Sequence, residues 1–319
     1  MHSSIFYVGS EPYCVWDVDL VARRDEYLSA MDPEYFLYVA DQHTAAADEK
    51  RSALALRLHL HHSLETFFSL VGAFVQAIDC PFAWIAKCSN SELFEVVRRI
   101  SREDSTLFTK LPFEGISWKK LSEHLFRTIP DPRHDTDQLI EAYAQLWKGA
   151  ATEFLAPERQ DEYNALKHGF RVGAGGFRLE FALHTGSDEQ PDPSSFVKLG
   201  EAKFGTTFLK VSPITKRRTE RSLNVQRHYN NWPIERVLLL NRSLYLSIHN
   251  FTRAFHLANA REPIPAGYRH PVDLDALNSA WKHSPGVSNL HWHSQATASV
   301  IPSLSKQQIE ERVALHRAA

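Results

Sequence analysis

The sequence predicts a mainly α-helical protein: a helical bundle with a small three-stranded antiparallel β insert and an extended C-terminal tail. Apolar residues recur with a helical period over residues 33–172 and again over 215–260. Between these stretches, after Gly173-Ala-Gly-Gly176, apolar and polar residues alternate as they do in strands. From residue 261 onward the chain is rich in Pro, Gly, His and Ser, which is typical of a wrapping tail.

The helices of the first stretch have recognisable start signals. Asp32-Pro33-Glu34 combines an N-cap residue with proline at the first helical position, and a helical pattern follows to about Ile78 with a break near residues 41–47. Its wide apolar stripe predicts a central helix. Further helices are expected over residues 81–87, 91–100, 117–129, 135–155 and 157–168.

After Gly176 the apolar residues change from a helical period to the alternation that is typical of strands. Residues 177–183, 196–199 and 206–211 are expected to form the three strands of the insert. Helix is then predicted over 216–229, from Pro233 to about Ala260, and over 305–316. The expected organisation is an irregular segment (1–32), the bundle (33–172), the β insert (173–214), long helices completing the bundle (215–260) and the tail (261–319).

Composition places the chain among ordinary globular proteins. It has 319 residues, 43% of them hydrophobic and 23% charged, with a net charge of -2. No window approaches 18 uninterrupted apolar residues, and we predict no membrane partner. Cys14, Cys80 and Cys88 are odd in number and lack metal-ligand spacing, so reduced thiols in a cytoplasmic protein are expected.

Charge is distributed unevenly along the chain. Residues 1–50 hold ten acidic and three basic residues, whereas residues 201–236 hold eight basic and three acidic residues. A basic segment attracts RNA or a nucleotide, and it can equally meet the acidic portion of the same chain across a homodimer. Both alternatives stay open at the level of sequence.

The strongest functional pattern is the short amphipathic helix expected from Pro157 to His168. Asn164 and His168 are four residues apart and share a face, with Lys167 and Arg171 close by. Gly169 suits the helix exit, where a left-handed residue commonly ends a helix. An imidazole, a carboxamide and two cations in one place are suited to phosphate binding or acid–base chemistry.

A second polar group lies on the first long helix. His59, His62 and Glu65 are spaced by three and share a face, a pattern suited to a metal ion or to a carboxylate that orients an imidazole. A solvated polar face explains the same spacing, and no further metal ligand is indicated, so we predict no metal and no cofactor. The chain contains no GxSxG, HExxH, GK[ST] or paired CxxC motif, which leaves hydrolase, zinc protease and NTPase functions without direct support.

With these helices and the run Tyr163-Asn164-Ala-Leu-Lys-His168, the chain resembles the HEPN superfamily. The resemblance implies a bundle of four or five helices, a place in prokaryotic toxin or defence systems and, for many members, metal-independent ribonuclease activity. The family signature is an Arg, a following polar residue and a His a few residues later. Asn164 matches the polar residue and His168 the catalytic His, but Tyr163 occupies the Arg position.

Three functions therefore stay open. The first is a non-catalytic HEPN-like protein that binds RNA, a nucleotide or a partner, and the second is a metal-independent ribonuclease. In the ribonuclease, His168 moves the proton and Asn164 and Glu65 orient it, while Lys167, Arg171, Arg159, His59 and His62 hold the substrate. The third is a metal-dependent helical enzyme that uses His59, His62 and Glu65.

Overall fold

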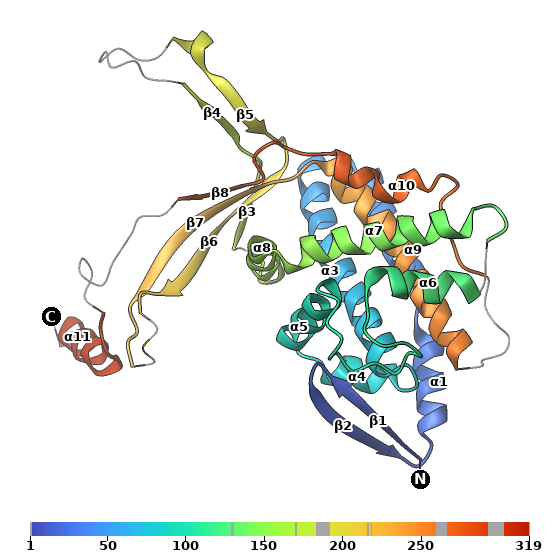
Figure 1. The fold of residues 1–319 in the computed structure, drawn as a ribbon. Helices are drawn as coiled ribbons and strands as arrows, with labels where there is room; N and C mark the ends of the chain where they lie inside the picture. Colours follow the sequence, from blue (N-terminus) through green and yellow to red (C-terminus); the bar gives the residue numbers. More distant parts are fainter. Residues whose placement is uncertain are drawn as a thin grey trace. The chain divides into compact units, whose positions relative to one another are not determined.

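The chain forms two compact units in a computed structural model that describes residues 2–128, 131–169, 171–182, 192–215, 217, 219–259, 267–292 and 303–318 (Figure 1). Unit 1 comprises Met1–Gln160 and Pro233–Ser284. Unit 2 comprises Asp161–Trp232 and Pro285–Ala319.

Unit 1 is mainly helical. The helix starts predicted at Glu34, Pro81 and Thr136 are confirmed, as is the break between the first two long helices. Its elements are β1 (His2–Val8), β2 (Glu11–Asp17), α1 (Leu20–Ala30), α2 (Glu34–Ala45), α3 (Glu49–Gln76), α4 (Pro81–Lys87), α5 (Asn90–Ser101), α6 (Trp118–Thr128), α7 (Thr136–Leu155), α9 (Ile234–Ala258), α10 (Asp275–Asn278) and the 3-10 turn η2 (Ser279–Lys282).

The core of unit 1 is built on α3 and α9, which run side by side in the same direction. Near their starts the amide of Asn241 on α9 donates to the carbonyl oxygen of Leu56 at 3.3 Å. Along the same pair, the Phe74 ring lies 5.4 Å from Phe251 and 5.3 Å from Phe255. All three rings are buried, and burying each contributes roughly 1.5–3 kcal/mol. The expectation that the first long helix is central is therefore confirmed.

An irregular segment was expected for residues 1–32. The structure instead has a β-hairpin followed by a helix there. β1 and β2 pair antiparallel, and the alternating residues Ser4, Phe6 and Val8 are buried. The Gln76 side chain at the end of α3 accepts from the Gly9 N–H at 3.0 Å and donates to its carbonyl oxygen at 2.9 Å. This amide holds the hairpin turn, which explains why so short a β element is ordered.

Unit 2 contains a four-stranded sheet and a separate hairpin, so the predicted three-stranded insert is wrong. The sheet has the order β3-β6-β7-β8, and the hairpin is β4-β5; all the pairings are antiparallel. The strands are β3 (Val172–Ala174), β4 (Arg178–Phe181), β5 (Val197–Glu201), β6 (Gly205–Pro213), β7 (Leu223–Asn231) and β8 (Asn289–Trp292), with a 3-10 turn η1 (Pro193–Ser195) before β5.

One strand of the sheet, β7, comes from a segment for which helix was expected. Residues 223–231 form β7 and not part of a helix over 216–229, and only α9 of the expected helices completes unit 1. The run Leu223-Asn-Val-Gln-Arg-His-Tyr alternates with period two, which fits a strand, and Val225 pairs with Val211 of β6. Lys216 and Arg218 of the predicted basic segment lie outside the described residues.

The C-terminal tail also carries structure. β8 within the expected tail completes the sheet edge by pairing with β7, and the predicted last helix is present as α11 (Lys306–Ala318). α8 (Pro157–Lys167) begins in unit 1 and ends in unit 2. Within unit 2 its buried Glu162 accepts from Thr206 at 2.5 Å and from the Trp232 indole at 3.1 Å. Among the described helices, none combines the length and the apolar content that crossing a bilayer requires.

Candidate functional site

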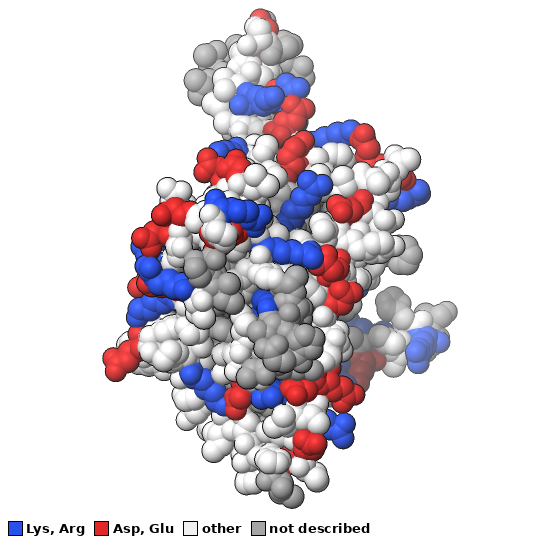
Figure 2. Space-filling model, turned by 90° about the vertical axis from the view of Figure 1, so that its right-hand side faces the viewer, with Lys and Arg blue, Asp and Glu red and all other residues white. Residues whose placement is uncertain are grey.

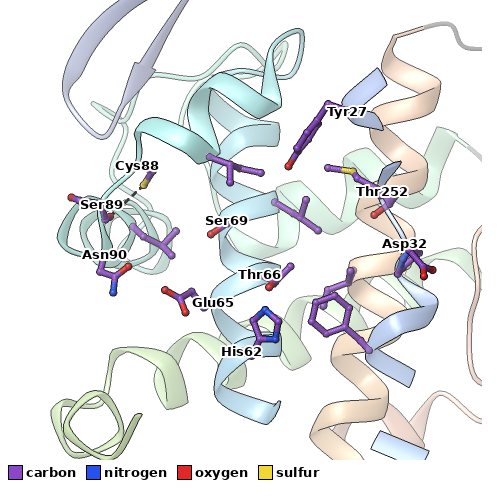
Figure 3. Close-up of a pocket in the computed structure, with 17 residues that line it drawn as sticks. Tyr27, Asp32, His62, Glu65, Thr66, Ser69, Cys88, Ser89, Asn90 and Thr252 are labelled. Atoms are coloured by element: carbon purple, nitrogen blue, oxygen red, sulfur yellow. Dashed lines mark hydrogen bonds between the residues drawn. The ribbon is translucent and has the colours of Figure 1, made fainter. Parts of the chain in front are cut away.

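A cavity of unit 1 lies beside α3 and has a volume of about 430 Å³ (Figure 3). We call it the α3 pocket. Side chains of α1, α2, α3, α4, α5 and α9, with the segments that join them, form its wall. The lining residues are Tyr27, Met31, Asp32, Pro33, Phe36, His62, Glu65, Thr66, Ser69, Leu70, Ile85, Cys88, Ser89, Asn90, Leu93, Ile248 and Thr252.

One face of α3 supplies the polar floor of this pocket. His62, Glu65, Thr66 and Ser69 recur at spacings of three and four, so they project from the same side of the helix. In Figure 3 Glu65 extends from α3 on the side of Asn90, while Asp32 lies on the opposite side of the pocket. The predicted pair His62 and Glu65 thus lines a real cavity, together with hydroxyl groups that the sequence analysis did not single out.

Most titratable groups of the α3 pocket are held in their neutral forms. Burial raises the pKa of the Cys88 thiol to about 12, with Glu92 acting in the same direction. Burial also raises the pKa of the Tyr27 phenol. Desolvation lowers the pKa of His62, and the neighbouring Glu65 only partly opposes this effect. At neutral pH the formal charges of the lining residues are therefore those of Asp32 and Glu65.

Acidic side chains already accept hydrogen bonds at the two helix N-termini of the pocket wall. The Ser89 hydroxyl accepts from the Glu92 N–H at 3.3 Å, and the Glu92 carboxylate accepts from the Ser89 N–H at 2.7 Å. This is a complete capping box at the start of α5. At the start of α2 the Asp32 carboxylate accepts from the Glu34 N–H at 3.1 Å. The positive ends of both helix dipoles therefore already face acidic side chains of the protein.

His59, the third member of the predicted α3 group, does not open into the pocket. It is buried, and its Nε2 donates to the carbonyl oxygen of Phe36 at 2.8 Å. Its ring lies 6.4 Å from that of His62. Across the described residues, no group of three or more His, Cys, Asp and Glu side chains is arranged to hold a metal ion. This geometry gives the metal-dependent alternative no support.

Arg159, a predicted substrate-binding residue, is part of a buried charge cluster in unit 1. Its Nε lies 3.1 Å from Glu153 Oε1, and Arg57 and Arg236 contact the same carboxylate at 3.3 and 2.9 Å. Burial by itself raises the pKa of Glu153, but the guanidinium groups of Arg159, Arg57 and Arg236 lower it to about 2. The cluster ties α3, α7, α8 and α9 together, which is a structural role.

The other predicted residues lie at the end of α8 in unit 2. Asn164, Lys167, His168 and Arg171 are all exposed. Gly169 has a φ of +67°, which confirms the predicted left-handed helix exit. Lys167 Nζ lies 4.2 Å from the centroid of the Tyr163 ring. His59, His62 and Glu65 belong to unit 1, so the expectation that Glu65 orients His168 and that His59 and His62 hold the same substrate stays a prediction.

Over the face shown in Figure 2, Lys and Arg side chains are interspersed with Asp and Glu side chains and form no continuous patch of one sign among the described residues. Comparisons of the chain with protein-family models, curated proteins and solved structures found no match. The geometry of the two units is therefore the basis for a functional conclusion.

Proposed function

We propose that unit 1 binds a small organic molecule in the α3 pocket. The observation that carries this proposal is the cavity itself, whose volume of about 430 Å³ is large enough for a small metabolite. Its wall combines apolar side chains such as Leu70 and Ile248 with a few polar groups on one helix face. Binding pockets typically pair an apolar wall with a small number of placed polar groups in this way.

A side chain that fills the cavity tests the proposal. Ser69 lies at the centre of the pocket floor, so Ser69→Phe is expected to occupy the space that a ligand would take. Ser105→Phe, at an exposed position outside the pocket, is the matched control. Saturation-transfer NMR with hexan-1-ol and hexylamine as probes is expected to give signals for wild type and the control, and to lose them for Ser69→Phe. Equal signals for all three proteins would contradict the pocket function.

A second candidate function is RNA binding by unit 2, with or without cleavage, as the HEPN resemblance implies. One observation favours it. Tyr163 occupies the sequence position where the family signature has Arg, and the cationic side chain of Lys167 lies over the Tyr163 ring. Unit 2 also holds 14 Lys and Arg against 10 Asp and Glu. A net positive unit with exposed Lys167, His168 and Arg171 suits a polyanion.

Two measurements separate binding from cleavage. RNA binding by the full chain is expected to weaken as salt rises, and Lys167→Gln is expected to reduce both the affinity and the salt slope. Catalysis requires that wild type cleaves RNA and that His168→Ala does not. Salt-dependent RNA binding without cleavage by wild type or by His168→Ala would support the non-catalytic alternative. The cytoplasmic location, the defence role and the homodimer stay predictions.

A further inference from the structure

We propose that the ligand of the α3 pocket is an organic cation with an apolar body, such as a primary or quaternary amine, and that Glu65 binds its charged end. This proposal rests on the pocket function proposed above and adds the chemical class of the ligand. It is carried by the charges of the lining, by the composition of its walls and by the position of Glu65 on the floor.

The charges of the lining favour a cation. Among the lining residues in the described part of the chain, two are acidic and none is Lys or Arg. The phenol, thiol and imidazole of the pocket stay neutral at pH 7 for the reasons given above, so they do not offset the two carboxylates. A carboxylate or phosphate ligand would find no Lys or Arg to pair with among the described lining residues, and it would lose its hydration.

Glu65 is the carboxylate best placed to hold the charged end. Asp32 is exposed at the pocket margin, whereas Glu65 is half-buried. Glu65 projects from the middle of α3 on the pocket floor, between the Thr66 hydroxyl and the Asn90 side chain in Figure 3. Hydroxyl and amide oxygens accept the additional hydrogen bonds that an ammonium group donates.

The walls suit the rest of such a molecule. Leu70, Leu93 and Ile248 present aliphatic surface, while Tyr27 and Phe36 add aromatic rings to the lining. The faces of aromatic rings attract organic cations, and this attraction grows when water is excluded. Apolar walls with one charged end favour a molecule that has the same division, which distinguishes an alkyl- or arylamine from a bare metal ion.

Three probes of one length test the charge preference: hexylamine, hexan-1-ol and hexanoate. Their affinities are measured by calorimetry at pH 7 and low salt for wild type, Glu65→Gln and the matched control Glu114→Gln, an exposed position outside the pocket. Wild type and control are expected to bind hexylamine at least about tenfold more tightly than hexanoate. Glu65→Gln is expected to lose about tenfold in hexylamine affinity while its affinity for hexanol stays within about twofold. The thermal unfolding midpoint of each variant shows that it is folded.

The outcomes distinguish this proposal from the pocket function. Hexanol or hexanoate binding as tightly as hexylamine, with loss of all binding in Ser69→Phe, would keep the pocket function and overturn the cation proposal. Hexylamine binding that Glu65→Gln leaves unchanged would also overturn it. Binding of none of the three probes to wild type would contradict both proposals.

Discussion

In unit 1 most of the large apolar side chains of α3 and α9 are buried, whereas in unit 2 several of those on the strands β6 and β7 are open to solvent. Leu244 of α9 is 0% exposed, but Leu209 of β6 and Val225 of β7 are 54% and 51% exposed. The cause is the length of the strands. β3 pairs with β6 only up to Phe208, and the described part of β8 pairs with β7 only from Arg227, so among the described residues no further strand lies beside the outer half of this ribbon. A single ribbon cannot bury both of its faces.

The units also differ in charge. Unit 1 holds 22 Lys and Arg against 28 Asp and Glu, while unit 2 holds 14 against 10. The helical unit therefore combines a buried core, a cavity and an acidic balance, which suits a small cation. The sheet-bearing unit combines exposed surface with a basic balance, which suits a large partner or a polyanion. The two proposed functions, binding of a small molecule and binding of a polyanion, therefore belong to different units.

The largest expected effect comes from the buried carboxylate of unit 1. Glu153→Gln keeps the size of the side chain but removes the negative charge that Arg57, Arg159 and Arg236 share. We expect a loss of about 3–5 kcal/mol in the free energy of unfolding. Hydrogen exchange of α3 and α7 measures it, with Glu158→Gln in the first turn of α8 as the control. Equal protection in the two variants would show that the cluster does not stabilise unit 1.

A matched pair of leucines tests the packing difference itself. Leu244→Ala in unit 1 is expected to cost about 2–5 kcal/mol because it leaves a cavity in the core. Leu209→Ala in unit 2 is expected to change stability by less than about 0.5 kcal/mol. Segment-resolved hydrogen exchange reports each unit separately. A large effect of Leu209→Ala would mean that a partner, such as a second copy of the chain, covers the ribbon.

The sequence predicts unit 1 better than unit 2 for a physical reason. Helix starts depend on nearby residues, so Pro33, Asp135 and Pro157 predict α2, α7 and α8 closely. The four-stranded sheet depends on β8, which pairs with β7 across about 60 residues of sequence, and no local signal encodes that pairing. β7 was the avoidable error, because its alternation was visible in the sequence although helix was expected over 216–229.

The candidate site was predicted in part. The spacing of His62 and Glu65 correctly indicated one face of α3, and the same period extends to Thr66 and Ser69. Those hydroxyls, in the mostly apolar second half of α3, are the signal that could have extended the site. The contributions of Asp32 and Asn90 come from how α2 and α5 pack around α3, which the sequence does not reveal. The burial of His59 and Arg159 is likewise a result of tertiary packing.

The stability of unit 1 is expected to depend on pH because this unit buries a histidine, His270. Burial lowers the pKa of His270 to about 4, and the nearby Asp131 only partly opposes this effect. Since the unfolded pKa is near 6.5, the stability from neutral His270 is complete above that pH and is lost as the pH falls toward 4. We expect a loss of about 2–3 kcal/mol between pH 7 and 4. Urea unfolding at both pH values measures it: His270→Gln should flatten the dependence, and His2→Gln, at an exposed position, should not.

The smallest expected effect lies at the end of α8, where unit 2 presents the HEPN-like residues. Gly169 has a φ of +67° and no neighbour within 4 Å of an added Cβ, so conformation alone decides the cost of a substitution. Gly169→Ala is expected to lose about 1–2 kcal/mol, and Gly169→Asn less, because Asn tolerates the left-handed region better. Hydrogen exchange of the last turn of α8 reports the difference. If both variants leave that turn equally protected, the helix exit does not fix the orientation of His168, and the RNA-binding candidate loses its positioned imidazole.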